Sequence, residues 1–457
     1  MDQSLPVPPQ KQTAEHMTPQ RRQRRMETYR VAWIVLTLSF ITFITVCASL
    51  SFGVYYFAFQ SGISMNAQVT VAQGTVGLVS RDLSERFDDR EESVFLEDRV
   101  STDSQSQAQV VFRDAVSPQT LAASVTLLND SEMEVLRMVQ PRYEWGRIDY
   151  QVVLQANQGI FDIYIPATLP RATSLTFNLP YDVLVDVSES GQYTLIVTEE
   201  QIEMHTRSGR AAILPVERSQ ARSIATGQIG VYDVLRGQAS VSNEQQELIP
   251  NNIFTTQSAD FEPVEDGSTV TFDLWNCTDR TQTTTPGVLE WVRFQGRLAL
   301  HIVRTGTQTH GETGCIQPLG DSAQSGSPVA GYSDLTLRST FYIADHSLDG
   351  CGVAASECPL MLLIDYIDTD GDRNKWFQGF YAKFDPLSEY PTRCNSAGCE
   401  EHKAINGGAW YVYESGNLLN SLPADRQPES ILNVQFYASG HGYDIYISDL
   451  SLLATPG

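Results

Sequence analysis

The sequence predicts a mostly β protein in which one N-terminal transmembrane helix is followed by two β domains. Three observations carry this prediction. An uncharged apolar run covers residues 31–59. From residue 67 onward, short segments of alternating apolar and polar residues recur at a spacing of roughly ten residues, which is typical of sandwiches and barrels. Six of the seven cysteines lie beyond residue 270, which indicates that the second half of the chain differs from the first.

The apolar run is long enough to cross a lipid bilayer. A bilayer core of about 30 Å needs about 20 helical residues. Trp33 stands near one end of the run and Tyr55 and Tyr56 stand near the other, where aromatic side chains meet the membrane interfaces. A cleaved secretory signal is the alternative, but its apolar core would span only about 7–15 residues. We therefore expect a permanent transmembrane helix over 31–59.

The charges that flank the run predict its direction. Residues 1–30 are Pro/Gln-rich at the start, carry a net charge of +3 and include Arg21, Arg22, Arg24 and Arg25. No charged residue follows the run until Arg81. The positive-inside rule then places a disordered tail, residues 1–30, in the cytoplasm and the bulk of the chain outside it. The expected location is the cell membrane, crossed once, with the membrane as a partner.

The overall charge limits the classes of partner. The formal net charge is −24. Nucleic acids bind to basic patches, so no nucleic-acid partner is expected for this acidic chain. The sequence leaves the oligomeric state open.

The cysteine pattern predicts disulfide bonds and an oxidising compartment. Short loops favour the pairs Cys351–Cys358 and Cys394–Cys399, which leaves Cys277 with Cys315. A zinc site is the alternative. The spacings C-x6-C and C-x4-C are not those of the usual close ligand pairs, and no histidine cluster accompanies them. Three disulfides are therefore the preferred interpretation.

The first β domain is expected over residues 66–238, and residues 66–235 of it resemble the FecR-type periplasmic domain. The resemblance is carried by the segments "EDRVSTDSQSQAQVVF", "SVTLLNDSEMEVL", "VVLQANQGIFDIYI", "VDVSESGQYTLIVTEEQIEMHTRSGRAAIL" and "RSIATGQIGVYDV". Two features depart from the family pattern. Residues 114–119 replace the usual "DGS" turn, and the "GT-x-F-x-V" segment is represented by Gly191, Tyr193 and Leu195 without the Gly-Thr pair.

The FecR resemblance implies an outer β domain but no anti-sigma activity in the chain itself. FecR-type regulators pass an outer signal to a cytoplasmic domain that binds a sigma factor. Such an inner domain needs roughly a hundred residues to form a core, and only residues 1–30 precede the helix in this chain. One alternative function is therefore a FecR-type transmembrane signalling regulator that acts with a separate anti-sigma partner.

A linker is expected over residues 239–267, and a second β domain over 268–457. The linker is polar and acidic and contains prolines. The strands that follow are longer and more apolar, and a two-sheet sandwich would close them. The closing segment "SGHGYDIYISDLSLL" resembles a jelly roll of the galactose-binding or carbohydrate-binding type, over residues 265–455. That resemblance implies a glycan ligand.

Two groups of side chains in the second domain are candidate sites. Asp368, Asp370 and Asp372 stand close together in "DYIDTDGDRNKW". Carboxylates at this spacing around a glycine either hold calcium, the one cofactor that the sequence suggests, or form a polar hairpin turn. Aromatic faces stack on sugar rings, so exposed aromatic residues would bind glycan, whereas residues on the other face of a strand pack in the core. The aromatic candidates are Trp376, Trp410, Tyr411 and Tyr413.

The sequence carries no catalytic signature. It contains no H-E-x-x-H zinc motif and no G-x-S-x-G nucleophile elbow. We therefore expect a non-enzymatic binding or sensing protein of a bacterial envelope, with a glycan or cell-wall polymer as its ligand. A glycan-active hydrolase is the further alternative, since paired carboxylates cannot be recognised from sequence alone.

Overall fold

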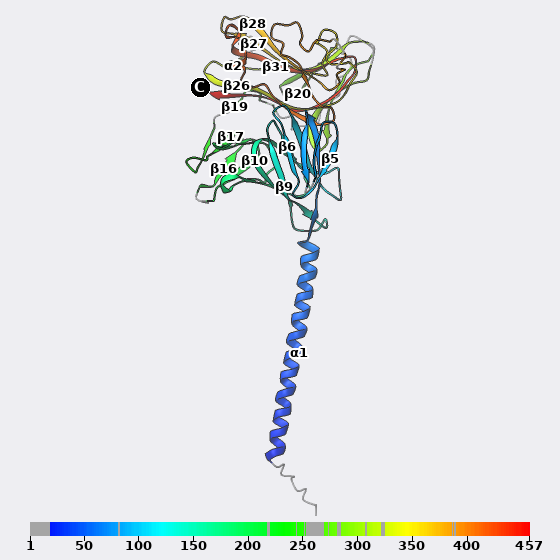
Figure 1. Ribbon diagram of the computed structural model, residues 1–457, viewed down its shortest axis with the longest axis vertical. Coiled ribbons are helices and arrows are strands. Elements are labelled where there is room, and N and C mark those ends of the chain that lie inside the picture. The colour runs from blue at the N-terminus through cyan, green and yellow to red at the C-terminus, as the bar shows by residue number, and fades with distance from the viewer. Residues whose placement is uncertain are drawn as a thin grey trace, which may run out of the picture. The chain divides into compact units, whose positions relative to one another are not determined.

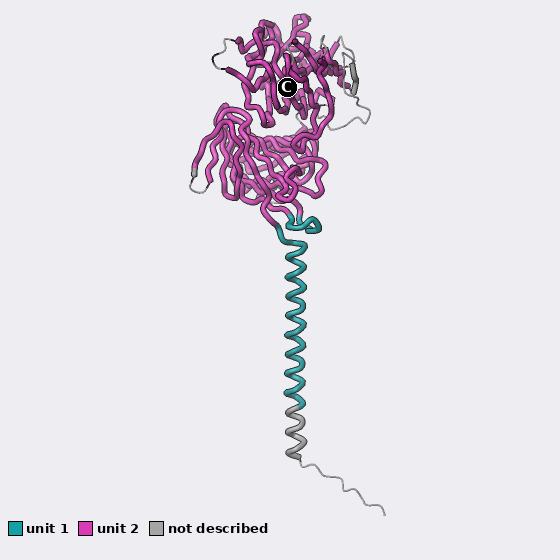
Figure 2. The backbone as a smooth tube through the Cα atoms, turned by 90° about the vertical axis from the view of Figure 1, so that its right-hand side faces the viewer, with its two compact units in different colours: residues 1–62, 141–148 teal, residues 63–140, 149–457 magenta. Residues whose placement is uncertain are grey.

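The structure is a computed structural model that describes residues 19–80, 83–216, 220–243, 245–250, 252, 269–272, 274–280, 285–306, 309–320, 325–385, 387 and 390–457, without the side chains of 19–28, 83 and 269–272. The chain divides into two compact units (Figure 2). One comprises residues 1–62 and 141–148, and the other comprises 63–140 and 149–457.

The first unit is built on one long helix, α1 (Pro19–Phe59) (Figure 1). Its part from Tyr29 to Phe59 is long and apolar enough to cross a membrane. The helix begins earlier than expected, because residues 19–30 are helical and do not form a disordered tail. The physical reason is local: arginine, glutamine, methionine and glutamate are strong helix formers, and proline is favoured at a first helical position such as Pro19. The rest of the expected tail, residues 1–18, lies outside the described residues.

The strands from β1 to β18 form a closed barrel, which we call the first β assembly. Their bounds are β1 Gly62–Ser64, β2 Asn66–Gln73, β3 Val76–Ser80, β4 Leu83–Phe87, β5 Glu91–Val94, β6 Arg99–Thr102, β7 Gln107–Arg113, β8 Leu121–Leu127, β9 Glu132–Pro141, β10 Tyr150–Ile165, β11 Thr173–Leu179, β12 Val183–Val187, β13 Gly191–Val197, β14 Gln201–Ser208, β15 Arg210–Leu214, β16 Arg222–Ala225, β17 Gln228–Asp233 and β18 Gln238–Ser242. A short 3-10 turn, Pro180–Asp182, joins β11 to β12.

The barrel comprises two hydrogen-bonded sheets, and strand β10 belongs to both. Its first half pairs with β9 and, in parallel, with β11, whereas its second half pairs with β8 and β13. The change from one set of partner strands to the other occurs at Gly159, whose φ of +119° disfavours any side chain. A Cβ at this position would also lie 2.4 Å from Cα of Ser131. Alternate side chains of the surrounding strands, such as Phe161 and Phe177, are fully buried between the two sheets.

The strands from β19 to β32 form two further sheets, which we call the second β assembly. One sheet has the order β22-β23-β32-β26-β30, with β19 beside β32, and the other has the order β20-β21-β24-β31-β27-β28-β29, with β25 beside β31. The bounds are β19 Gln246–Glu247, β20 Thr269–Phe272, β21 Trp275–Asp279, β22 Val288–Phe294, β23 Arg297–Arg304, β24 Gly311–Pro318, β25 Ser327–Pro328, β26 Tyr332–His346, β27 Leu360–Asp368, β28 Arg373–Tyr381, β29 Lys403–Ala404, β30 Trp410–Glu414, β31 Pro428–Gly440 and β32 Tyr443–Pro456. The short helices α2 (Leu418–Ser421) and Ala424–Arg426 lie between β30 and β31.

The two sheets of the second β assembly enclose one apolar core, as a sandwich does. Its three disulfides join Cys277 to Cys315, Cys351 to Cys358 and Cys394 to Cys399, the pairs that loop length predicts. The expected fold class is confirmed: the chain is mostly β, with one N-terminal apolar helix and sandwich-like sheets.

The segment expected as a linker, residues 239–267, is partly strand. Strand β18 continues the first β assembly to Ser242, where it pairs with β17. Strand β19 then pairs with β32 of the second β assembly. Glu244, Asn251 and residues 253–267 lie outside the described residues.

Candidate binding cleft between the two β assemblies

The four aromatic candidates are all buried. Trp376 and Trp410 are 2% and 1% exposed, and Tyr411 and Tyr413 are similarly enclosed. Both tyrosine rings pack beside Phe380 in the sandwich core. None of the four forms an exposed platform on which a sugar ring would stack.

Trp410 is buried for a reason that the strand pattern does not reveal. It points away from the sandwich core, beside Phe294 and Tyr342 on the outer face of its sheet. The guanidinium of Arg297 lies over its ring at 5.5 Å. Arg297 is itself 1% exposed and donates to Ser124 Oγ of the first β assembly at 3.1 Å. The first β assembly therefore covers a sheet face that an isolated sandwich would leave open.

The acidic candidates form the hairpin turn between β27 and β28. Asp368 is buried, and its Oδ1 accepts the backbone N–H groups of Asp370 and Asp372 at 3.0 and 2.9 Å. Its Oδ2 accepts the side-chain amide of Asn374. Gly371 completes the turn with a φ of +85°. The carboxylate of Asp368 is thus engaged within the turn, and the three aspartates do not form a ligand cluster among the described residues.

His402 lies between two disulfides. Its Nδ1 accepts the backbone N–H of Gly379 at 3.0 Å, and its Nε2 lies 2.8 Å from the carbonyl oxygen of Ala355. Burial lowers the pKa of this imidazole. The cysteines within reach of His402 are all disulfide-bonded, so they offer no thiolate to a metal. The arrangement is a packed structural cluster.

A cleft of about 580 Å³ opens where the two β assemblies meet. Ligand pockets in proteins commonly measure about 300–1,000 Å³. Its lining combines amide, hydroxyl and phenol groups with apolar side chains and two charged ones. The residues that line it are Gln73, Ser104, Gln105, Gln107, Leu128, Asn129 and Ile160 from the first β assembly, and Lys403, Tyr411, Val412, Tyr413, Glu414 and Gly416 from the second.

Two glutamines of β7 fix one wall of the cleft against strand β30. Gln107 donates through Nε2 to the carbonyl of Val412 at 2.9 Å and accepts the N–H of Val412 through Oε1 at 3.3 Å. Gln109 Oε1 accepts the N–H of Trp410 at 3.4 Å. Strand β30 is an edge strand whose backbone would otherwise lack partners on that side. The two side chains therefore take the place of a neighbouring strand.

The second β assembly contributes one cation and two phenol groups to the lining of the cleft. The Tyr411 hydroxyl donates to Gln73 Oε1 at 3.1 Å, and Gln73 in turn donates to the carbonyl of Ala404 at 3.2 Å. Lys403 Nζ lies 5.4 Å from the centre of the Tyr413 ring. Partial burial of its ammonium group lowers the pKa of Lys403. Gln105 and Asn129 carry exposed amides on the facing turns.

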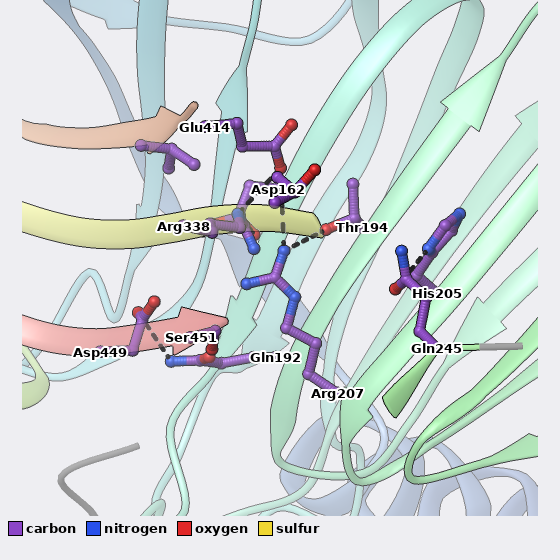
Figure 3. Close-up of polar contacts among 12 residues, drawn as sticks. Asp162, Gln192, Thr194, His205, Arg207, Gln245, Arg338, Glu414, Asp449 and Ser451 are labelled. Carbon is purple, nitrogen blue, oxygen red and sulfur yellow. Dashed lines mark hydrogen bonds and ion pairs between the residues drawn. The ribbon is translucent and has the colours of Figure 1, made fainter. Parts of the chain in front are cut away.

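Glu414, which lines the cleft, belongs to a cluster of charged side chains that Figure 3 shows. Glu414 Oε1 lies 3.0 Å from Nε of Arg338, and the Nη2 atom of Arg338 lies 2.6 Å from Asp162 Oδ1. Burial opposes the charge of Arg338, but the carboxylates of Asp162, Glu414 and Asp449 raise its pKa above the ordinary value. Arg207 adds a second guanidinium, 3.9 Å from Glu414.

Asp449 completes this cluster on strand β32. Its Oδ2 accepts the side-chain amide of Gln192 at 3.4 Å (Figure 3). It is fully enclosed, and burial raises the pKa of its carboxyl to about 6 although Arg338 opposes the shift. Asp449 and Gln192 come from different β assemblies, so this contact also helps to fix the walls of the cleft.

The cleft is suited to a polar ligand of little charge. The side chains of Ser104, Gln105 and Asn129 are exposed at the cleft and provide both donors and acceptors, as the hydroxyl groups of a sugar require, whereas the amides of Gln73 and Gln107 are engaged within the walls. Hydrolysis of a glycosidic bond normally uses two carboxyl groups that flank it. Glu414 is the one carboxylate among the described residues that line the cleft, and it is paired with Arg338.

The sequence analysis identified Tyr411 and Tyr413 but missed the rest of the cleft. The missed polar residues of the first β assembly are isolated glutamines, one asparagine and one serine, and those of the second are Lys403 and Glu414. The two groups are about 300 residues apart in the sequence, as in the contact of Gln107 with Val412. Such residues are common on surfaces and carry no motif. A clue was present in β7, where polar Gln107 and Gln109 alternate with apolar residues in a strand that is buried on both faces.

No protein-family model and no curated protein matches the chain. Solved structures do match parts of it. One is described as a "putative anti-sigma factor" from Parabacteroides distasonis, with 12% identity and a TM-score of 0.23, and the match covers 32% of this chain and 59% of that one. The chain therefore spans less than two thirds of that structure.

Two further matches are carbohydrate-binding modules. The family 11 module of a cellulosomal cellulase from Clostridium thermocellum has 9% identity and a TM-score of 0.24, over 46% of this chain and 95% of the module. The module TmCBM61, solved with β-1,4-galactotriose, has 11% identity and a TM-score of 0.23, over 45% of this chain and 97% of the module. These matches concern strand arrangement, and the resemblance to FecR-type domains stays a prediction.

Proposed function

We propose that this chain is a single-pass, membrane-anchored binding protein that recognises a glycan or cell-wall polymer in the cleft between its two β assemblies. The observation that carries the proposal is the cleft of about 580 Å³, at which Ser104, Gln105 and Asn129 present an exposed hydroxyl and two exposed neutral amides. The apolar part of α1 supports the anchor. The arginine-rich segment before it supports a cytoplasmic N-terminus and an extracytoplasmic cleft.

We propose further that the protein binds its ligand without catalysing a reaction on it. The carboxylate of Glu414 is held by Arg338 at 3.0 Å, so it is poorly placed to donate a proton or attack a sugar. The walls of the cleft are held by side-chain bonds between the two β assemblies, which favours a preformed site.

The test is a glycan array probed with the full-length chain in detergent, followed by calorimetry with the glycans that bind. Replacing Gln105 and Asn129 together with alanine should weaken binding about tenfold, since each lost hydrogen bond contributes about 0.5–1.5 kcal/mol. The matched control replaces Asn157 and Gln238, two exposed amides outside the cleft, and should leave the affinity unchanged.

Two results would overturn the proposal. If the cleft variant and the control variant bind the glycan with equal affinity, the glycan does not bind in the cleft. Recovery of the bound oligosaccharide as shorter fragments, measured by mass spectrometry after prolonged incubation, would show that the protein is an enzyme.

A further inference from the structure

Residues 141–148, between β9 and β10, form a loop that belongs to the same compact unit as α1 (Figure 2). Two backbone hydrogen bonds hold this loop at the C-terminal end of the helix. Arg142 N–H donates to the carbonyl of Ser61 at 3.0 Å, and Arg147 N–H donates to the carbonyl of Phe59 at 2.8 Å. The loop is therefore fixed to the helix end by its backbone as well as by its side chains.

The loop presents two stacked aromatic rings beside the helix. Tyr143 and Trp145 lie parallel, with ring centres 5.0 Å apart, and the edge of Tyr143 meets Phe57 at 5.9 Å. Trp145 is 62% exposed. Together with the last turns of α1 the rings border an apolar groove of about 510 Å³. The groove is lined by Ser49, Leu50, Gly53, Val54, Phe57, Ala58, Tyr143 and Trp145.

Two exposed arginines flank these rings. The guanidinium of Arg142 lies 5.2 Å from the centre of Phe57. The guanidinium of Arg147 lies 5.4 Å from the centre of Phe59 and donates to the Tyr55 hydroxyl at 3.1 Å. Glu144 lies between the two arginines, so the loop has a net charge of +1. Aromatic rings with adjacent cations are typical of side chains at a membrane interface.

The length of the helix places this loop at a membrane surface. The part of α1 that is apolar enough to cross a membrane has 31 residues. At 1.5 Å per residue it extends about 46 Å, which exceeds the bilayer core of about 30 Å. One end must then enter the headgroup region or the helix must tilt. The groove is formed by the last turns of the helix, where lipid would cover it.

We infer that the loop 141–148 is a second membrane contact, which binds an anionic phospholipid of the leaflet that surrounds the C-terminal end of α1. Tyr143 and Trp145 lie at the boundary between acyl chains and headgroups, an acyl chain occupies the groove, and Arg142 and Arg147 face the lipid phosphate. This inference rests on the membrane anchor proposed above. Two segments of the chain, and not one, then meet the bilayer.

The test uses tryptophan fluorescence of the full-length chain in nanodiscs that contain lipids spin-labelled near the headgroup. Of the six tryptophans, Trp33 and Trp145 are exposed and the other four are at most 9% exposed. Trp145→Phe should therefore remove roughly half of the quenched amplitude, as should Trp33→Phe. The control Trp410→Phe should remove only unquenched signal.

The outcomes distinguish a failure of the inference about the loop from a failure of the proposed membrane anchor. Quenching of Trp33 without quenching of Trp145 would overturn the inference and leave the anchor in place. Absence of quenching at both positions would overturn the anchor and the inference together.

A second comparison tests the lipid charge in a Trp33→Phe background. Spin-labelled phosphatidylglycerol should quench Trp145 several-fold more strongly than spin-labelled phosphatidylcholine, because one net positive charge enriches anionic lipid near it. Replacing Arg142 and Arg147 with glutamine should abolish this preference. Arg236→Gln, at an exposed arginine outside the loop, should preserve it. Equal quenching by the two lipids would overturn the choice of an anionic ligand.

Discussion

Arg338 on β26 and Asp162 on β10 form an ion pair of 2.6 Å in which both side chains are at most 5% exposed. The two residues are 176 positions apart in the sequence and belong to different β assemblies. Removing two charges from water costs several kcal/mol per ion, which their mutual attraction must offset. The pair joins the two assemblies, and Arg338 also contacts Glu414, which lines the cleft.

The first prediction concerns the loss of this pair. Arg338→Ala leaves Asp162 buried without its cation, which should lower the free energy of unfolding by about 3–5 kcal/mol. Arg90→Ala is the matched control, because its pairs with Glu85 and Glu92 are largely exposed and should contribute at most about 1 kcal/mol. Urea denaturation of the full-length chain in detergent measures the change in the free energy of unfolding for both variants. A cost for Arg338→Ala no larger than that of the control would contradict the structure.

The second prediction follows from the raised pKa of Asp449, about 6 in the folded state against an ordinary value of 3.8. Between these values the folded protein holds a proton that the unfolded chain has lost. Stability should therefore fall as the pH rises from about 4 through 6, and the penalty should remain, at about 3 kcal/mol, at higher pH.

Asp449→Asn removes the ionisation and keeps the shape of the side chain. The difference in melting temperature between this variant and the parent should be small near pH 4, should grow in favour of the variant through pH 6, and should then level off. Asp89→Asn, at an exposed position, should show no such trend. A difference that stays constant across the pH range would disprove the buried position of the carboxyl.

The third prediction concerns the disulfides. Mass spectrometry of the non-reduced chain should show the loss of six hydrogens from the cysteines. The bond Cys277–Cys315 closes a separation of 38 residues, and Cys394–Cys399 closes one of 5. In the chain-entropy description, replacing the first pair with alanines should cost about 4 kcal/mol and replacing the second about 2 kcal/mol. Free thiols detected at Cys351 or Cys394 in the folded protein would refute the pairing.

The fourth prediction concerns the turn between β27 and β28. Asp368→Ala removes the acceptor of two backbone N–H groups and should cost about 1–2 kcal/mol, whereas Asp370→Ala should change stability by less than about 0.5 kcal/mol. Because Asp368 is engaged in the turn, we expect millimolar calcium to leave the melting temperature unchanged. A rise in melting temperature with calcium that Asp370→Ala abolishes would restore the metal hypothesis.

The sequence predicts local features of this protein well. Alternation of apolar and polar residues identifies strands such as β11 and β12, because one face of each lies against the barrel core. Short loops identify the disulfide partners, because a cross-link between close residues needs little chain ordering. The start of α1 was missed for a local reason as well, since the charged residues before Tyr29 favour helix as strongly as the apolar ones after it.

The contact between the two β assemblies is not predictable in the same way. Trp410 lies on the outer face of its sheet, where alternation predicts exposure, and it is buried only because Arg297 and the first β assembly cover it. Ion pairs such as Asp162 with Arg338 cannot be recognised from the local alternation of apolar and polar residues. The cleft forms only where the two assemblies meet, so its lining residues cannot be predicted from the sequence of either assembly alone.

Strand β32 has a consequence for how the chain acquires its structure. It pairs with β23 on one side and with β26 on the other, and every other strand of that sheet precedes it in the sequence. During synthesis from the N-terminus, the pairs β22–β23 and β26–β30 emerge before the strand that joins them. Their unpaired edges must stay apart from one another and from other chains until residues 443–456 arrive. Assembly of this sandwich is therefore dominated by distant contacts, and we expect it to be slow and to need protection from aggregation while it proceeds.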